Sequence, residues 1–532
     1  MSDRKIYNIL LIFLVNLCVN ITLLPQEVPH PVNNRGVYEF LDELAGLNII
    51  SVNSAVKPFS RLTIAQLLQE ADNNRESLNI RQKQELDFYL LDFGKELNNY
   101  KTGKKRFDIF YYKDSLFSIT VNPVAGSEIF YNSSSTATYW QNGITASAYI
   151  SKWGFYASLR DNHEKPLLGL PEYLTQRESG HIKNSTDWSD MQGGVTYSWK
   201  WGNIGLVKDK FTWGNNYHGA NIFGGNNPSY IHLRLHLKPV RWFDFNYFHG
   251  WLNSMVIDSS RSYYVTNSYG TDYREVYHKK FIAANLFTIT PLKYLNISAG
   301  NSIIYTDLGL FPAYLVPVFF YKSVDHSVNS GIDNMNSQMF FDISSRKIKH
   351  FHLYATLFVD ELSVKRIFKK NEWNFISWKG GMRLTDLPVN NLFFTVEFTY
   401  NYPLTFRHYV PTLTFESNNY NLGHYLKDNS REWFISIQYK PIRGLSTEFW
   451  FIDAVRGPDY TEAGGSRTGN PPLASIEWHN RNIGLKADYQ IINDLYIWLA
   501  ISSGNISGDE RWSPDFFEGK KNTLNAGFIW GF

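Results

Sequence analysis

The side chains best suited to chemistry form a row of basic residues that alternate with apolar ones. The basic residues are His232, Arg234, His236 and Lys238, and the apolar ones are Ile231, Leu233, Leu235 and Leu237. Side chains of a β-strand point alternately to its two faces, so the basic groups share one face. His232 and His236 are then about 13 Å apart, too far for one metal ion. The row predicts a basic wall for an acidic polysaccharide or a small anion. The alternative is a solvated inner face that is paired by neighbouring strands.

A second candidate is the loop 212–228, which is rich in aromatic, amide and glycine residues. Its side chains with sugar-binding chemistry are Trp213, Asn215, Asn216, Tyr217, His218 and Asn221. Aromatic rings can stack on the apolar face of a sugar, while amides exchange hydrogen bonds with its hydroxyls. The loop therefore predicts a polysaccharide-binding site. The alternative is a loop folded into the body of the protein, with its glycines and asparagines serving only as turn residues.

The sequence shows no catalytic, metal or cofactor motif. It contains no Gly-x-Ser-x-Gly segment, and its single cysteine, Cys18, excludes a disulfide or a multi-cysteine zinc site within the chain. A net charge of +3 without a basic arm or a glycine-rich phosphate loop argues against nucleic acid as a partner. We therefore expect no enzyme, no cofactor and no nucleic-acid partner.

The N-terminus carries the pattern of an export signal. Arg4 and Lys5 precede an apolar run over 9–19. This predicts a signal peptide over 1–24, with the cleavage point left open between 18 and 26. An uncleaved anchor is one alternative. Lipid attachment at Cys18 is another, but the residue before it, Leu17, is larger than that reaction accepts.

Residues 25–102 predict a small helical bundle. Apolar residues recur at helical spacing from Val37 to Leu47, and again over 64–71 and 86–97. Ser60 or Thr63 is a suitable N-cap for the second helix. Asn79, with Gln82 three residues later, predicts a capping box for the third. We expect this bundle on the periplasmic side of a membrane.

From 103 to 532 the period changes from that of helices to that of strands. Segments such as 231–238, 392–400 and 482–491 alternate apolar and polar residues. Aromatic residues make up 17% of the chain although its mean hydropathy is −0.31, which suits a sheet with one apolar and one wet face. Eight short turns alternate with long polar loops, the pattern of outer-membrane barrels. The sequence thus predicts an all-β transmembrane barrel of about 18 antiparallel strands, with both termini in the periplasm.

The last strand ends on Phe532, and Leu524, Ala526, Phe528 and Trp530 precede it at alternate positions. A closing strand with a terminal phenylalanine is similar to the signal that the outer-membrane assembly machinery reads. We therefore expect that machinery as a partner.

Several stretches resemble the Wzi-type capsule assembly family of outer-membrane barrels. They are 37–44, 58–61, the Trp-Gly segment 211–214 with the Asn-rich stretch 226–231, and then 333–334, 353–354 and 359–362. The resemblance implies a lectin-like protein of the Gram-negative outer membrane, which holds capsule or exopolysaccharide at the cell surface and has surface polysaccharide and outer-membrane lipid as partners. The alternative function is a porin or channel for small sugars or anions. The helical bundle favours the first, since simple porins lack one.

Overall fold

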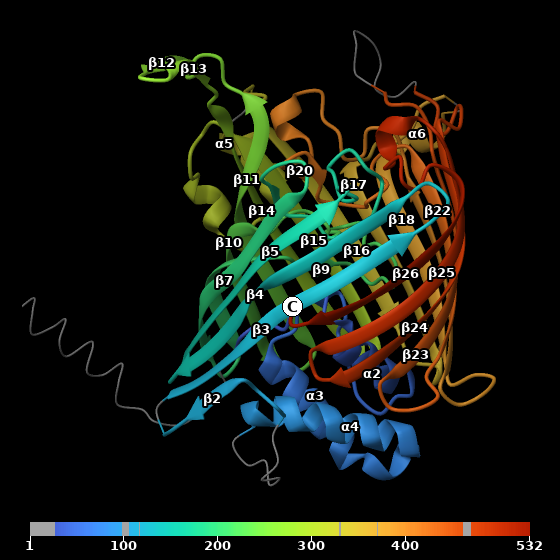
Figure 1. Ribbon diagram of the computed structural model, residues 1–532. Helices are drawn as coiled ribbons and strands as arrows, with labels where there is room; N and C mark the ends of the chain where they lie inside the picture. Colours follow the sequence, from blue (N-terminus) through green and yellow to red (C-terminus); the bar gives the residue numbers. More distant parts are fainter. Residues whose placement is uncertain (1–26, 98–105, 116, 329–330, 370, 461–469) are drawn as a thin grey trace, which may run out of the picture.

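The computed structural model describes residues 27–97, 106–115, 117–328, 331–369, 371–460 and 470–532, so the predicted signal peptide lies outside the described residues. A closed antiparallel barrel of 18 strands dominates the fold (Figure 1). Its strands are β3(Phe117–Tyr131), β4(Thr136–Ile150), β5(Trp153–Lys165), β7(Asp187–Trp199), β8(Gly202–Asp209), β10(Tyr230–Val240), β11(Phe243–Ile257), β14(Tyr277–Leu292), β15(Leu295–Thr306), β16(Met335–Ser345), β17(Phe351–Glu361), β18(Phe375–Thr385), β19(Leu392–Asn401), β22(Ser430–Tyr439), β23(Leu445–Arg456), β24(Trp478–Ile492), β25(Leu495–Gly508) and β26(Gly519–Trp530). The last strand pairs with the first, Trp530 opposite Ala125, and closes the barrel.

The connections follow the predicted alternation. Short turns at 151–152, 200–201, 241–242, 293–294, 346–350, 386–391, 440–444 and 493–494 lie at one end, which we call the short-turn end. The longer connections lie at the opposite end, which we call the loop end; there β3 and β4 are joined by the tight connection 132–135. The predicted fold, 18 antiparallel strands preceded by helices, is confirmed.

Smaller elements decorate the barrel. The short strands are β1(Val56–Lys57), β2(Phe110–Lys113), β6(His181–Ile182), β9(Thr212–Trp213), β12(Tyr263–Asn267), β13(Gly270–Arg274), β20(Glu416–Ser417) and β21(Tyr420–Asn421). The short helices of the connections are η3(Pro312–Leu315), α5(Tyr321–Val328), α6(Val364–Ile367), η4(Pro411–Leu413) and η6(Glu510–Trp512). Strands β12 and β13 form a hairpin that projects beyond the barrel at the loop end, as Figure 1 shows.

The two faces of each strand are those expected from the alternation. On β10, Ile231 is half exposed on the outside of the barrel, whereas His232 is buried inside. On β19, Glu397 and Thr395 are buried inside the barrel. The inner row can carry charge because loops and helices inside the barrel supply partners for it.

An apolar cluster occupies part of the lumen. Inward residues of the wall, among them Phe248, Ile282 and Phe340, meet residues of inward-folded loops, among them Phe223 and Phe415. These side chains are nearly or fully buried, so this side of the lumen has the packing of a protein core.

Three helices cover the short-turn end, as Figure 1 shows in blue. They are α2(Arg35–Gly46), α3(Arg61–Asn73) and α4(Ile80–Phe93), with the single turns η1(Arg75–Ser77) and η2(Gly94–Glu96) after α3 and α4. The Ser60 side chain caps α3, and Asn79 and Gln82 form the predicted capping box of α4. Within the described residues, none of the helices is long and apolar enough to cross a membrane.

The helices are fastened to the short turns by polar contacts. Arg81 donates to Asn391 Oδ1 at 2.9 Å and also pairs with the buried carboxylates of Glu43 and Glu85. The backbone N–H of His350 donates to the carbonyl of Gly46 at 2.7 Å. These contacts fix the helices across the mouth of the barrel.

Candidate functional site

The loop that the sequence singled out folds into the barrel. Its short strand β9 pairs with β1, a segment that rises into the lumen between α2 and α3, so that Val56 lies opposite Trp213. The indole of Trp213 is only 3% exposed and meets the rings of Phe223 and Phe248 edge to face at 5.2 and 5.3 Å. Trp213 therefore offers no free face for stacking on a sugar.

The amides of this loop are held by side chains of the barrel wall and of loop neighbours. Asn215 donates through its backbone N–H and its Nδ2 to the two carboxylate oxygens of Asp342, at 2.8 and 2.6 Å. Asn221 donates from Nδ2 to Ser377 Oγ at 3.1 Å and accepts from the Thr356 hydroxyl. Asn216 donates to the carbonyl of Gly214 at 2.8 Å.

The tip of the loop is fixed by one buried carboxylate. Glu397 accepts the backbone N–H groups of Tyr217 and His218 at 2.8 and 2.7 Å. Lys379 lies 3.4 Å from the same carboxylate and donates to the carbonyl of His218 at 2.8 Å. The imidazole of His218 stacks on Phe434, with the ring centroids 4.1 Å apart and the planes 7° from parallel.

The tip also joins the barrel wall to helix α2. The Tyr217 hydroxyl donates to Asp42 Oδ2 at 2.6 Å and lies 2.7 Å from His352 Nδ1. The guanidinium of Arg383 stands 4.6 Å over the Tyr217 ring. Burial alone would raise the pKa of Asp42, but the neighbouring charges of Arg346, His352 and Arg383 outweigh burial and lower it. Asp42 is therefore the anionic centre of this junction.

A cavity of about 290 Å³ lies beside this junction inside the barrel. Asn215, Asn216 and Tyr217 of the predicted set line it together with Gln176, Glu39 and Gln438. Lys440 and Arg383 outweigh the effect of burial on Glu39 and lower its pKa to about 2. The cavity thus presents amides and paired charges, a lining suited to a small polar group.

The residues of the basic row of β10 have different partners in the structure. His232 is buried against Phe211, with ring centroids 5.1 Å apart, whereas His236 Nε2 lies 3.2 Å from Asp244 Oδ1 on the next strand. All four residues of the row line a second cavity, of about 270 Å³, near the short-turn end. His236 is thus in contact with a carboxylate of the neighbouring strand.

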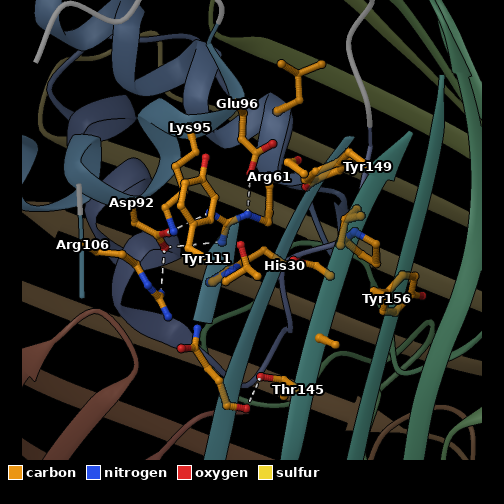
Figure 2. Close-up of a pocket in the computed structure, with 18 of the residues that line it drawn as sticks. His30, Arg61, Asp92, Lys95, Glu96, Arg106, Tyr111, Thr145, Tyr149 and Tyr156 are labelled. Carbon is orange, nitrogen blue, oxygen red and sulfur yellow. Dashed lines mark hydrogen bonds and ion pairs between the residues drawn. The ribbon is translucent and has the colours of Figure 1, made fainter. Parts of the chain in front are cut away.

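A third cavity, of about 350 Å³, lies between the helices and the inner wall at the short-turn end (Figure 2). Arg61 bridges Asp92 and Glu96 there, at 2.8 and 2.7 Å. Burial and the positive charge of Arg61 lower the pKa of His30 to about 4. Because its charges are paired within the protein, we interpret this cavity as a junction between the helices and the barrel.

The terminal residue turns towards this third cavity. Strand β26 ends at Trp530, and Gly531 has a φ of 83°, a conformation that favours glycine. The ring of Phe532 meets Tyr496, with the ring centroids 5.7 Å apart, and its carbonyl accepts from the Ser158 hydroxyl at 3.2 Å.

Among the residues that the structure describes, no group of three or more His, Cys, Asp or Glu side chains is placed to hold a metal ion.

The sequence analysis did not single out the tyrosine-rich hairpin of β12 and β13. Tyr264 and Tyr273 are cross-strand partners with ring centroids 4.9 Å apart. Tyr264 is 74% exposed, and Tyr269 at the turn is 97% exposed. The signal was the density of tyrosines over 263–277, among residues too polar to form a core.

These features define the class. A closed barrel with short turns at one end, long loops at the other and a filled lumen is the architecture of outer-membrane β-barrel proteins. The fold is similar to that of Wzi from Escherichia coli, described as an outer-membrane protein involved in group 1 capsule assembly and as a carbohydrate-binding β-barrel. The two are 12% identical, with a TM-score of 0.58, over 95% of this chain and 99% of that one. The predicted resemblance to Wzi is confirmed at the level of the fold.

Two porins of Pseudomonas aeruginosa are also similar. OccD3 is 12% identical over 77% of this chain and 90% of its own, with a TM-score of 0.41. OprD is 10% identical over 77% and 94%, also with a TM-score of 0.41. No protein-family model matches the chain, and no curated protein matches its sequence.

Proposed function

We propose that this protein is a lectin-like, non-enzymatic barrel of the Gram-negative outer membrane, and that it takes part in the assembly and attachment of capsule or exopolysaccharide. The short-turn end and both termini face the periplasm, and the loop end faces the medium. The apolar outer row contacts lipid. Phe532 is part of the signal that the assembly machinery reads during insertion.

The observation that carries this proposal is the filled lumen. The β1 segment and the inward loops 211–228 and 402–426 occupy the inside of the barrel and share one apolar cluster with its wall, and Tyr217 of the first loop bonds Asp42 of helix α2. A diffusion channel needs a continuous wet bore, whereas an anchor does not. The fold shared with a carbohydrate-binding barrel supports the same reading.

Polysaccharide contact is best supported at the loop end, where aromatic side chains are exposed. The hairpin presents Tyr264 and Tyr273 as a pair, and Thr266 and Thr271 follow them on the same face. Tyrosine suits this task because its ring can stack on a sugar and its hydroxyl exchanges hydrogen bonds with water and sugar. Each contact is weak, so retention comes from many repeats that engage many barrels.

In this proposal the predicted residues of the inward loop are not the main polysaccharide-binding site. Asn216 and Tyr217 line the 290 Å³ cavity, where they would meet a polar group that enters the lumen. Trp213, Asn215 and Asn221 hold the loop in place. The basic residues Arg234 and Lys238 would favour an anionic group in the second cavity.

The experiment is to delete the gene and measure polysaccharide on the cells and in the medium. We expect cell-associated polysaccharide to fall while the total stays level. The Tyr264→Ala/Tyr273→Ala variant should reproduce much of this loss, because both rings are exposed and the fold does not depend on them. Tyr264→Phe/Tyr273→Phe is the matched control and should retain polysaccharide, since the stacking faces remain.

The channel alternative is tested by planar-bilayer conductance of the purified barrel. We expect no steady ion conductance from the wild-type protein. A large, steady conductance together with unchanged polysaccharide retention in the deletion strain would replace the anchoring function with transport.

A further inference from the structure

The outer face of the barrel carries a polar patch on β14 and β15. Asn285 on β14 and Asn301 on β15 point outward, since their neighbours Ala284 and Ser302 point into the lumen. Ile289 and Ile297, which also point outward but lie nearer the short-turn end of the same strands, are apolar and exposed. Uncovered amides among apolar outward residues would be costly in lipid. Yet both are buried, with Asn285 fully covered.

The cover is part of the chain itself. The connection between β15 and β16 descends along the outside of the wall, and Figure 1 shows its helix α5 outside the barrel. Asn285 Nδ2 donates to the carbonyls of Pro317 and Phe319, each at 2.9 Å. Asn301 Oδ1 accepts the backbone N–H of Tyr321 at 2.9 Å, and the two amides bond each other at 2.7 Å.

Aromatic side chains complete this attachment. Tyr305 on the wall and Tyr314 and Tyr321 on the covering segment are fully buried in one cluster. The Tyr247 hydroxyl on β11 donates to the carbonyl of Tyr314 at 3.0 Å. The contacts come from three strands, so this is a fixed seat on the wall rather than a loop resting on it.

Ahead of helix α5, the opposite side of the covering segment is apolar. Val318, Phe319 and Phe320 are 59%, 40% and 45% exposed. On the neighbouring strand β16, the outward residue Phe341 is also exposed, and it lies opposite Ala299, two positions from Asn301. The segment therefore replaces a polar patch of the wall by an apolar surface, with its own backbone carbonyls satisfied by the asparagines.

We propose that residues 308–321 form a membrane-embedded addition to the barrel wall, and that the acyl chains of the outer leaflet pack on Val318, Phe319 and Phe320. Asn285 and Asn301 are the seat that holds the segment. This inference rests on the proposed location in the outer membrane. It assigns a lipid-binding surface separate from the polysaccharide-binding hairpin.

The test uses a spin label at a single cysteine, in the Cys18→Ser background, in protein reconstituted in phospholipid bilayers. Collisions with oxygen report lipid, and collisions with a water-soluble nickel chelate report water. Val318→Cys should be accessible to oxygen and shielded from nickel, as Phe341→Cys on the bare wall should be. Tyr269→Cys on the hairpin should show the reverse.

Every other outcome would contradict the proposed contact between this segment and lipid. A nickel-accessible label at position 318 would place the segment in water and overturn the inference, while Phe341→Cys would still report a barrel in lipid. A label shielded from both reagents would mean that protein, such as a second copy, covers the segment. If the label at 341 also met nickel, the proposed membrane location would fail as well.

A second variant tests the seat. Asn285→Leu/Asn301→Leu removes the amides and leaves an apolar wall, so the barrel should still insert, as judged by its heat-modifiable migration on a gel. The label at Val318→Cys should then become several-fold more mobile and more accessible to nickel. Unchanged accessibility in this variant would show that the asparagines do not hold the segment.

Discussion

Two connections at the loop end that contain many aromatic residues point in opposite directions. The loop 211–228 turns into the lumen, whereas the hairpin of β12 and β13, which begins 35 positions after it at Tyr263, projects away from the barrel. Trp213 of the first is 3% exposed, and Tyr264 of the second is 74% exposed. Both segments are rich in aromatic residues, so aromatic content alone does not determine the direction.

The difference lies in the partners that each segment finds. The inward loop carries Phe211, Ile222 and Phe223, which join an apolar cluster, and its polar groups meet Asp342 and Glu397 of the wall. The hairpin is held within itself: Tyr264 contacts Tyr273, and the Thr266 and Thr271 hydroxyls are 3.0 Å apart. Aromatic rings with long-range partners become structure, and rings with only local partners stay available for binding.

The largest contrast is expected from truncating one ring in each segment. Trp213→Ala should lower the free energy of unfolding by about 3–5 kcal/mol, because it leaves a cavity among Phe223, Phe248 and Phe340. Tyr264→Ala should change it by less than about 0.5 kcal/mol, as for an exposed surface residue. Urea unfolding of the barrel in detergent micelles measures both. Equal effects would remove the distinction between the two segments.

A second contrast concerns the carboxylates. Glu397→Gln should destabilise the protein by about 2–3 kcal/mol, because it weakens the hydrogen bonds of two loop N–H groups and leaves Lys379 buried without its charge partner. Asp272→Asn on the hairpin is the matched control and should be nearly neutral. Protease digestion is a second readout: the loop should be cleaved faster in Glu397→Gln. If Asp272→Asn proved as costly, the hairpin would have partners beyond itself.

The sequence predicted those features that rest on local patterns. The turn at 200–201, the cap at Ser60 and the capping box at Asn79 each depend on neighbours within a few residues. The alternation of residues such as Arg234 and Leu235 also set the inner and outer faces. The direction of the 212–228 loop depended instead on Glu397 and Asp342, more than 100 positions away, and no local pattern indicates them.

The outer-wall segment was missed for a related reason. Asn285 and Asn301 interrupt an apolar outward row, which is a readable signal, but its meaning depends on carbonyls of residues 317 and 319. A lone asparagine in such a row is equally typical of a strand end or a bulge. Only the three-dimensional contact separates these explanations.

The smallest contrast is one of pH. Tyr217 anchors the inward loop to helix α2 through Asp42, whose pKa is lowered from its ordinary 3.8 chiefly by Arg346, His352 and Arg383 against the opposing effect of burial. A carboxylate with a lowered pKa in the folded state stabilises fully above its ordinary pKa, and its contribution is lost as the pH falls through the folded value. Tyr217→Phe should therefore cost about 1.5–2 kcal/mol at pH 7, the lower part of the range for one hydrogen bond to a charged acceptor. That cost should shrink only as the pH falls well below 3.8, through the lowered pKa that Asp42 has in the folded state, because Asp42 then loses the charge that the hydroxyl serves. Tyr264→Phe, on the hairpin, should show no difference from wild type at either pH. The measurement is the free energy of unfolding of the three proteins from pH 7 to pH 1, so that the range passes through the lowered pKa of Asp42. A Tyr217→Phe cost that stayed constant over this range would mean that the hydroxyl stabilises the fold mainly through His352, and that the loop and the helix are not joined by the Asp42 charge.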